Sequence, residues 1–171
     1  MKTSPLSQIV ERIRSEQQLT REVPDFDPQN GNEAARFLFV LEAPGPKAVA
    51  SGFISLKNED QTARNFQAQL AAAGVSSADI ALWNVVPWYL GNAELSKIRG
   101  ARSLDVKQGL QYLTAVVAAI KNLQCIDQPG VFVPPPLLVL SSPAGGFRAR
   151  VVGPRDYYVD GPYCNESASV R

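Results

Sequence analysis

The stretch FLFVLEAPGP, residues 37–46, decides the fold of this chain of 171 residues. Its unbroken apolar run, bounded by turn-forming residues, is typical of a strand buried on both faces of a parallel sheet, and the predicted strand covers residues 36–41. A carboxylate, Glu42, follows at once, and Pro44 and Pro46 then flank a single glycine. Proline fixes the backbone angle φ, whereas glycine allows many backbone conformations. The chain that leaves the strand is therefore stiff except at Gly45. We expect the segment to hold Glu42 in a defined position.

Two further buried strands are predicted along the chain. The first lies in DIALWNVVPWYLG, residues 79–91, and ends where Pro87 removes a hydrogen-bond donor. The second is LLVL, residues 137–140, which follows a proline-rich approach. Strands that alternate with helices predict an α/β protein, in which ligands bind outside the carboxyl ends of the strands. Glu42 and Pro87 both fall at such ends.

Apolar residues recur at helical spacing in three segments, residues 5–19, 58–74 and 103–123. Short polar residues that can accept a hydrogen bond from the first turn stand at the start of each segment. We therefore expect Ser4, Asn58 and Ser103 to cap these helices, and Gly74 to end the second one.

The charge balance of the chain excludes a general attraction to polyanions. The chain has 17 basic and 16 acidic residues, a net charge of +1, so nucleic-acid binding would need a local basic patch. Lys97, Arg99 and Arg102 form the best candidate, in the polar connection after the second predicted strand. They suit contacts to phosphate, which position a protein without reading base sequence. A solvated run of charges explains the same residues equally well.

The sequence has no histidine and only two cysteines. Histidine is the residue most used for acid–base chemistry near neutral pH, so its absence narrows the possible reactions. Cys125 and Cys164 lie far apart without a CxxC partner, which argues against structural zinc or an iron–sulfur cluster. We expect no metal and no cofactor.

Membrane insertion and secretion are not expected from this sequence. No apolar run approaches the roughly 18 residues that a membrane helix needs. The segment MKTSPLSQIVERIRSEQQ at the start of the chain is too charged for a secretory signal. We therefore expect a cytoplasmic protein, and a monomer, that is not associated with a membrane.

The chain resembles the uracil-DNA glycosylase superfamily, in the branch with an EAPGP-type first motif and an NVVPWY segment. Four segments together carry this resemblance: VPDFDPQNG, VLEAPGPKAV, GFISLKNEDQTARNF and WNVVPWYLG. The resemblance covers residues 22–123. It implies a three-layer α/β/α fold with a short, mostly parallel central sheet. It also implies DNA repair: the protein would flip uracil or a related damaged base out of DNA and hydrolyse its N-glycosidic bond.

In this resemblance the EAPGP motif forms the floor of the base pocket. Glu42 would stabilise the cationic sugar and position a water, because cleavage of the bond develops oxocarbenium character. Ala43 would contact the base, at a position where some relatives carry an aspartate that handles the water. Pro44 and Gly45 would fix the backbone of the loop. The alternative for Glu42 is a carboxylate salt-bridged at a strand end.

Two further residues would recognise the flipped base. Phe53 would stack on it, and the amide of Asn84, with both a donor and an acceptor, would read the edge of a pyrimidine. Gly52 and Asn58 would shape the loop between them and offer free amides to phosphate or base. The alternatives are an apolar packing residue at Phe53, a satisfied polar group at Asn84 and a helix cap at Asn58.

The chain departs from the superfamily in one respect. Relatives usually carry a second motif that begins His-Pro and whose histidine stabilises the departing base, and no stretch here matches it. We expect residues 1–140 to form the glycosylase-like domain and residues 141–171 to form a divergent or frame-shifted tail. The alternative function is a catalytically impaired relative that binds DNA or a nucleobase without cleavage. An unrelated nucleotide-binding protein ranks last, because no GxGxxG or Walker-type sequence is present.

Overall fold

The computed structural model describes residues 4–20, 22–127, 140–141, 148–151 and 157–160. The central sheet contains four strands in the order β4 (Ile80–Asn84), β2 (Phe37–Leu41), β5 (Cys125–Asp127) and β6 (Leu140–Ser141). β2 runs parallel to β4 and β5, whereas β6 is antiparallel to β5. The expected α/β class with a short, mostly parallel central sheet is confirmed.

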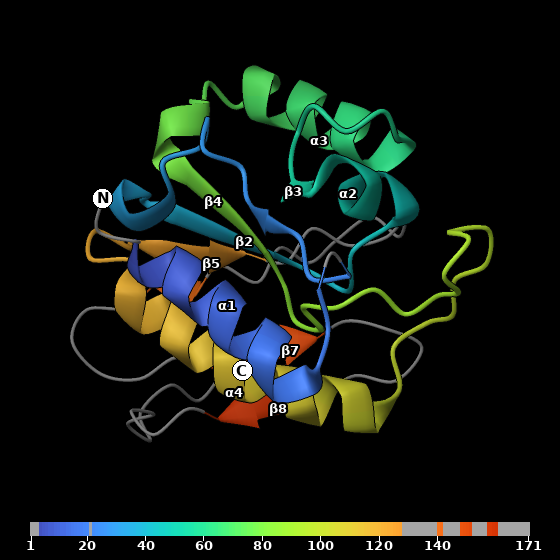
Figure 1. Cartoon of the computed structure of the whole chain (residues 1–171). Coiled ribbons are helices and arrows are strands. Elements are labelled where there is room, and N and C mark those ends of the chain that lie inside the picture. Colours follow the sequence, from blue (N-terminus) through green and yellow to red (C-terminus); the bar gives the residue numbers. More distant parts are fainter. Residues whose placement is uncertain (1–3, 21, 128–139, 142–147, 152–156, 161–171) are drawn as a thin grey trace.

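Two smaller pairs of strands accompany this sheet. β1 (Asp25–Phe26) is parallel to β3 (Phe53–Ile54), and β7 (Arg148–Val151) is antiparallel to β8 (Tyr157–Asp160). The helices are α1 (Pro5–Gln17), α2 (Pro46–Ser51), α3 (Gln61–Ala72) and α4 (Ser103–Ala119), with short 3₁₀ turns η1 (Asn32–Ala34) and η2 (Ser77–Asp79). α1 and α4 lie together on one side of the central sheet, and α2 and α3 lie on the other (Figure 1).

The strand that pairs with β2 on the side away from β4 is β5, which the sequence did not predict. The predicted strand LLVL is described only at Leu140, which lies in β6. Cys125–Ile126 pair with Phe37–Leu38, while Leu140 is antiparallel to Ile126. Most of LLVL lies outside the described residues. The expected tail is described only at Ser141 and in β7 and β8.

Two of the expected helix caps are wrong, and one is confirmed. The hydroxyl of Ser4 accepts a hydrogen bond from the backbone N–H of Ser7 at 3.1 Å, as expected for an N-cap. α3 is capped by Asp60 and not by Asn58, because the Asp60 carboxylate accepts the Ala63 N–H at 2.8 Å. Arg102 occupies the N-cap position of α4, which leaves Ser103 as its first helical residue.

The packing of aromatic side chains fixes the helices on the sheet. Phe39 of β2 meets Phe66 of α3 edge to face, with ring centroids 4.7 Å apart. Trp88, just after β4, meets Tyr112 of α4 in the same way at 6.5 Å. All four side chains are buried. The chain that follows β4 is therefore anchored to α4, and this anchoring limits how the strand end can move.

Gly109 allows α4 to approach the backbone that follows β4. A Cβ atom at this position would lie 1.8 Å from the carbonyl oxygen of Val85 and 3.2 Å from the Cα of Val86. Both obstacles are backbone atoms, so a side-chain rotation cannot relieve the clash. The glycine is thus required by close packing next to the end of β4.

Gly109→Ala is expected to destabilise the protein by about 1–3 kcal/mol, the usual range for overpacking. This loss exceeds the gain of up to about 1 kcal/mol that alanine brings to a helix interior. Chemical denaturation followed by circular dichroism measures the change, with Gln111→Ala on the exposed side of α4 as the control. An unchanged midpoint in Gly109→Ala would show that α4 does not press on the chain after β4.

Candidate functional site

The ends of β2 and β4 lie side by side. Leu41 is the pairing partner of Asn84, and the pairing continues past both strands. The N–H of Val85 donates to the Leu41 carbonyl at 2.8 Å, and the N–H of Val86 donates to the Glu42 carbonyl at 3.0 Å. The carboxyl ends of these parallel strands therefore place Glu42 and Asn84 at the same edge of the sheet, where α/β proteins bind ligands.

Asn84 is buried and incompletely paired. The residue is only 2% exposed, and its Nδ2 has no hydrogen-bond partner in the described part of the chain. Leaving a buried donor unpaired costs about 1–3 kcal/mol. Three other buried side-chain atoms of the described residues also lack a hydrogen-bond partner: Asn30 Nδ2, Asn32 Oδ1 and Trp83 Nε1. Among these four residues, only Asn84 stands at the end of a strand next to the chain that carries Glu42. An amide in this setting suits a ligand that presents an acceptor.

Glu42 is exposed, and one of its carboxylate oxygens is used by the fold. Oε1 accepts a hydrogen bond from the backbone N–H of Ala101 at 2.7 Å, a contact across 59 positions of the sequence. Glu42 has no salt bridge within the described residues. The carboxylate thus holds the chain before α4 through Oε1. Oε2 is the oxygen left to interact with a water or a ligand.

The stiff exit after Glu42 leads directly into a helix. Pro44 is buried, Ala43 and Gly45 are half-buried, and Gly45 is the extended N-cap of the six-residue α2. Pro46 occupies the first position of α2, where proline is favoured because its missing N–H would have no helical partner. The prolines therefore fix the path from β2 into α2.

Phe53 begins the two-residue strand β3 and is presented at the surface by a hydrogen-bonded loop, residues 51–58, that includes this strand. The side chain is 38% exposed, and Gly52 before it adopts a left-handed conformation with φ of 79°. Asn58 Nδ2 donates to the Phe53 carbonyl at 3.0 Å, and the Phe53 N–H donates to the Ser51 hydroxyl at 3.2 Å. The Ser51 hydroxyl also lies 2.8 Å from Asn58 Oδ1. Asn58 consequently supports the Phe53 loop.

Asp27 has a position that sequence reasoning did not single out. It is 7% exposed, and its carboxylate accepts hydrogen bonds from the Ser55 hydroxyl and from the Gln29 N–H. It thereby ties the end of β1 to the chain after β3. The only sequence signal was its place within VPDFDPQNG.

Phe53 is linked to Asn84 through β1. β3 pairs with β1, and Phe26 of β1 stacks on Trp83 of β4 with ring centroids 4.9 Å apart. The structure therefore places the backbones of Glu42 and Asn84 at neighbouring strand ends, and it links Phe53 to Asn84 only through β1. A shared cavity for all three residues stays a prediction.

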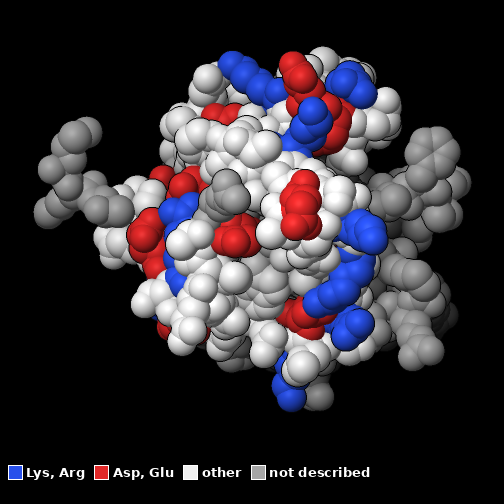
Figure 2. Space-filling view, turned by 45° about the vertical axis from the view of Figure 1, so that its right-hand side comes forward, with Lys and Arg blue, Asp and Glu red and all other residues white. Residues whose placement is uncertain are grey.

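Lys97, Arg99 and Arg102 are all exposed on the segment between β4 and α4. Basic side chains gather along the right-hand part of the face in Figure 2, with acidic side chains beside them. The guanidinium of Arg99 is already paired, since it donates to both oxygens of Asp105 at 2.6 and 3.0 Å. Phosphate contacts would therefore come first from Lys97 and Arg102.

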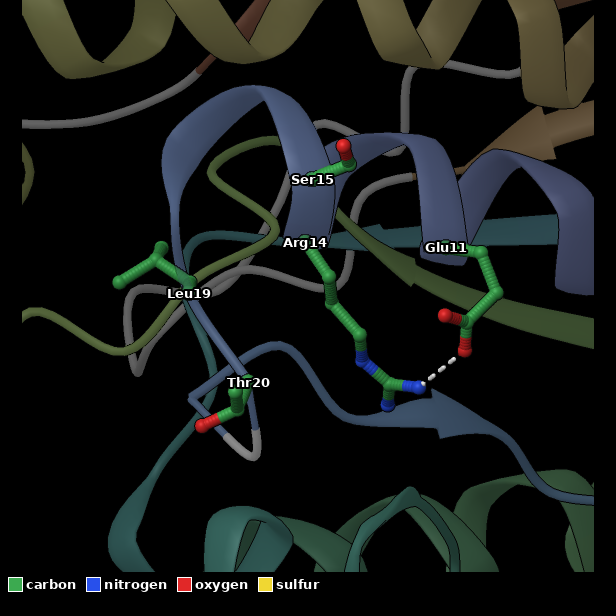
Figure 3. A pocket seen from close by; sticks show the side chains of 5 residues that line it. All are labelled: Glu11, Arg14, Ser15, Leu19 and Thr20. Carbon is green, nitrogen blue, oxygen red and sulfur yellow. Dashed lines mark hydrogen bonds and ion pairs between the residues drawn. The ribbon is translucent and has the colours of Figure 1, made fainter.

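A hollow of about 520 Å³ lies elsewhere, against α1 and the chain that follows it, and is lined by Glu11, Arg14, Ser15, Leu19 and Thr20. Arg14 points towards Glu11 and pairs with it at 2.7 Å (Figure 3). A second guanidinium nitrogen of Arg14 contacts Asp25 at 2.9 Å. The acids that surround this arginine neutralise its charge, and none of the predicted site residues lines the hollow.

Comparison with models of known protein families and with curated proteins gives no match for this chain. No cluster of His, Cys, Asp and Glu that could hold a metal ion occurs within the described residues. In the same part of the chain, no helix is both long and apolar enough to cross a membrane.

Protonation of Asp105 is expected to loosen residues 91–102. The hydrogen bonds from Arg99 lower the pKa of Asp105; partial burial opposes this effect, and the Arg102 N–H adds to it. A carboxyl group with a lowered pKa stabilises the fold above its unfolded value of about 3.9, and this stability is lost as the pH falls through the folded value. Amide exchange in residues 91–102, corrected for its intrinsic rate, should therefore stay level from about pH 6 to pH 4 and rise as the pH falls further.

Asp105→Asn serves as the control for this effect. It should show faster exchange in residues 91–102 already at about pH 6 and no further step on acidification, because its side chain does not titrate. The amides of β4 provide the internal reference. Equal pH profiles in the wild type and Asp105→Asn would contradict the role of this ion pair.

Proposed function

We propose that this chain is a DNA glycosylase of the uracil-DNA glycosylase type, with the three-layer α/β/α fold of that superfamily. The main support is the unpaired, buried amide of Asn84 at the end of β4, beside the end of β2 that carries Glu42. Helices on both sides of a mostly parallel sheet are consistent with the proposed fold. The substrate is uracil or a related damaged base in DNA.

The proposed reaction is hydrolysis of the N-glycosidic bond. The oxygen of a water forms a bond to the sugar carbon, the bond from that carbon to the base nitrogen breaks, and the base leaves with the electron pair. The water loses one proton to solvent, and the base anion takes up one proton from solvent, so the products are the abasic sugar with a new hydroxyl and the neutral base. Glu42 stabilises the cationic character of the sugar and orients the water through Oε2, while Oε1 stays with Ala101. The side-chain amide of Asn84 donates a hydrogen bond from Nδ2 to a carbonyl oxygen of the base. Phe53 stacks on the face of the base.

A second candidate is a relative that binds DNA or a nucleobase without cleaving it. It is favoured by the absence of any histidine in the sequence, because loss of one donor to the leaving group typically costs about 10²–10³ in rate. It is also favoured by the structural use of Glu42 Oε1. Incubation with a uracil-containing single-stranded oligonucleotide separates the two, since only the glycosylase produces alkali-labile abasic sites.

Glu42→Gln is the sharpest variant for the catalytic role. The amide oxygen of glutamine can still accept the Ala101 N–H, whereas the negative charge is lost. We expect cleavage to fall by about 10² or more while the thermal midpoint and oligonucleotide binding stay unchanged. Glu59→Gln, at an exposed position, is the matched control. Equal cleavage by the wild type and Glu42→Gln would rule out Glu42 as the acting carboxylate.

Asn84→Leu tests the recognition role against a purely structural one. Leucine has a similar volume and removes the unpaired donor, so the unfolding free energy should stay equal or rise. Affinity for the uracil-containing oligonucleotide should fall by about tenfold or more, because the hydrogen bond to the base is lost. Asn30→Leu, which removes another unpaired Nδ2, should not change affinity. A large loss of stability in Asn84→Leu, with affinity preserved, would assign Asn84 to the fold alone.

A further inference from the structure

Asp105, in the first turn of α4, holds the chain that leads into this helix. Its Oδ2 and Oδ1 accept hydrogen bonds from the guanidinium of Arg99 at 2.6 and 3.0 Å. Oδ2 also accepts the backbone N–H of Arg102 at 2.8 Å. Only 14% of the Asp105 side chain is exposed, so dissolved ions screen these bonds less than they would at an open surface. One carboxylate therefore fixes the chain on both sides of residues 100–101.

The peptide unit between Gly100 and Ala101 links this ion pair to the candidate site. Nη1 of Arg99, which binds Asp105, also donates to the Gly100 carbonyl at 3.1 Å. The N–H of the same peptide unit belongs to Ala101 and donates to Glu42 Oε1 at 2.7 Å. A continuous chain of hydrogen bonds thus runs from Asp105 through Arg99 and this peptide unit to Glu42.

The order of charges along this hydrogen-bond chain strengthens its last bond. A cation that donates to a carbonyl polarises the peptide unit, and the N–H of that unit then becomes a better donor. The bond from Ala101 to Glu42 also has a charged acceptor, which makes it stronger than a bond between neutral groups. Glu42 therefore interacts with the charge of Arg99 through the backbone, although it forms no ion pair within the described residues.

A helix cap alone does not explain this arrangement. An acid at the third position of a helix often accepts the N–H of the N-cap residue, which accounts for the bond from Arg102. The cap needs no contact with Arg99, whose guanidinium lies six positions before Asp105 and binds both of its oxygens. It also does not need the bond to the Gly100 carbonyl. These additional bonds fix the peptide unit that holds Glu42.

We propose that Arg99 and Asp105 are positioning residues, which set the direction of the Glu42 carboxylate through the peptide unit of Gly100 and Ala101. This inference rests on the proposed function, in which Glu42 stabilises the cationic sugar and orients a water. Because Oε1 is held by a fixed donor, the direction of Oε2 is fixed as well. Arg99 then serves the acid of the site, whereas contacts to phosphate come from other basic residues.

Single-turnover cleavage of the uracil-containing single-stranded oligonucleotide measures the effect on the reaction. Asp105→Asn removes the charge that holds Arg99, and the rate constant is expected to fall about tenfold, since a misplacement of about 1 Å can cost up to about 10²-fold. The dissociation constant of the oligonucleotide should change less than about twofold, because neither residue touches it. Asp105→Glu keeps the charge at a position that suits glutamate, so it should restore most of the rate.

Arg99→Lys separates positioning from a contact with phosphate. Lysine keeps the positive charge and can bind a phosphate, but it cannot bind both Asp105 oxygens and the Gly100 carbonyl in the geometry of a guanidinium. Positioning predicts cleavage about tenfold slower than in the wild type at unchanged affinity. A phosphate contact predicts unchanged cleavage in this variant, and that result would overturn the proposal.

A double-mutant cycle shows whether the effect passes through Glu42. When Glu42→Gln is present, Asp105→Asn should cause little further loss of cleavage, because residues that act through one another are not additive. Asp79→Asn, which removes an acid that pairs with Arg36 at 3.7 Å, is the matched control and should leave cleavage unchanged. Equal losses from Asp105→Asn with and without Glu42→Gln would overturn the proposal, since Asp105 would then act independently of Glu42.

Amide exchange tests the hydrogen-bond chain without any reaction, at about pH 6, where Asp105 is ionised. The exchange rate of the Ala101 N–H, corrected for its intrinsic rate, should rise about fivefold or more in Asp105→Asn and in Arg99→Lys, because the bond to Glu42 opens more often. Glu42→Ala gives the rate without this bond, and Asp79→Asn should keep the wild-type rate. An unchanged Ala101 rate in Asp105→Asn would contradict the positioning role, whatever the activity of the protein.

The positioning role and the proposed function fail in different ways. A wild type that excises no uracil, with Ala101 exchange that responds to Asp105→Asn, loses the glycosylase function and keeps the positioning of Glu42. A wild type that excises uracil, with cleavage or Ala101 exchange unaffected by Asp105→Asn, keeps the function and loses the positioning residues. A loss of oligonucleotide affinity in place of rate would assign residues 99–105 to DNA binding and would also overturn the proposal.

Discussion

The parallel pairing of β2 with β4 is the constraint on which the rest of the structure depends. Five consecutive residue pairs, from Phe37 with Ile80 to Leu41 with Asn84, fix the register, and two more hydrogen bonds extend it to Val86. A slip by one residue would turn the side chains of β4 to the opposite face and break the pairing of Asn84 with Leu41. Because every residue of β4 is buried, such a slip would also disturb packing on both faces. The fold and the candidate site therefore depend on one register.

At the carboxyl ends of β2 and β4, the buried interior meets the solvent-exposed surface. Asn84 lies in the core, where an unpaired N–H interacts strongly with any acceptor that reaches it, whereas Glu42 lies at the surface, where its charge is solvated. The proposed recognition by the amide would use the buried setting, and the proposed stabilisation of a cationic sugar by the carboxylate would use the exposed one. The buried packing of Trp88 on Tyr112 and of α4 on Val85 holds the boundary between them in place.

The sequence predicts the parts of the fold that follow from local patterns. Apolar runs predict β2 and β4, and helical spacing predicts α1, α3 and α4, because burial dictates both patterns. β5 is only three residues long and includes Asp127, so it carries no such pattern, and its place is set by pairing with β2. Asp60 replaces Asn58 as a cap because Phe53 recruits the Asn58 amide, which depends on the loop conformation. Contacts across long separations, such as Glu42 with Ala101, leave no local signal.

Glu42 can hold Ala101 and bind a ligand at the same time. A carboxylate has two oxygens, and a hydrogen bond to one of them restricts rotation of the group while the other remains available to a ligand. In a chain without histidine, the rate of a reaction at this site would depend more heavily on such fixed electrostatics than on proton transfer. The same bond fixes the chain between β4 and α4, so a ligand that moves this chain would also move the carboxylate. The hydrogen bond between Glu42 and Ala101 thus joins the end of β2 to the chain before α4. The position of the carboxylate depends on both of these segments.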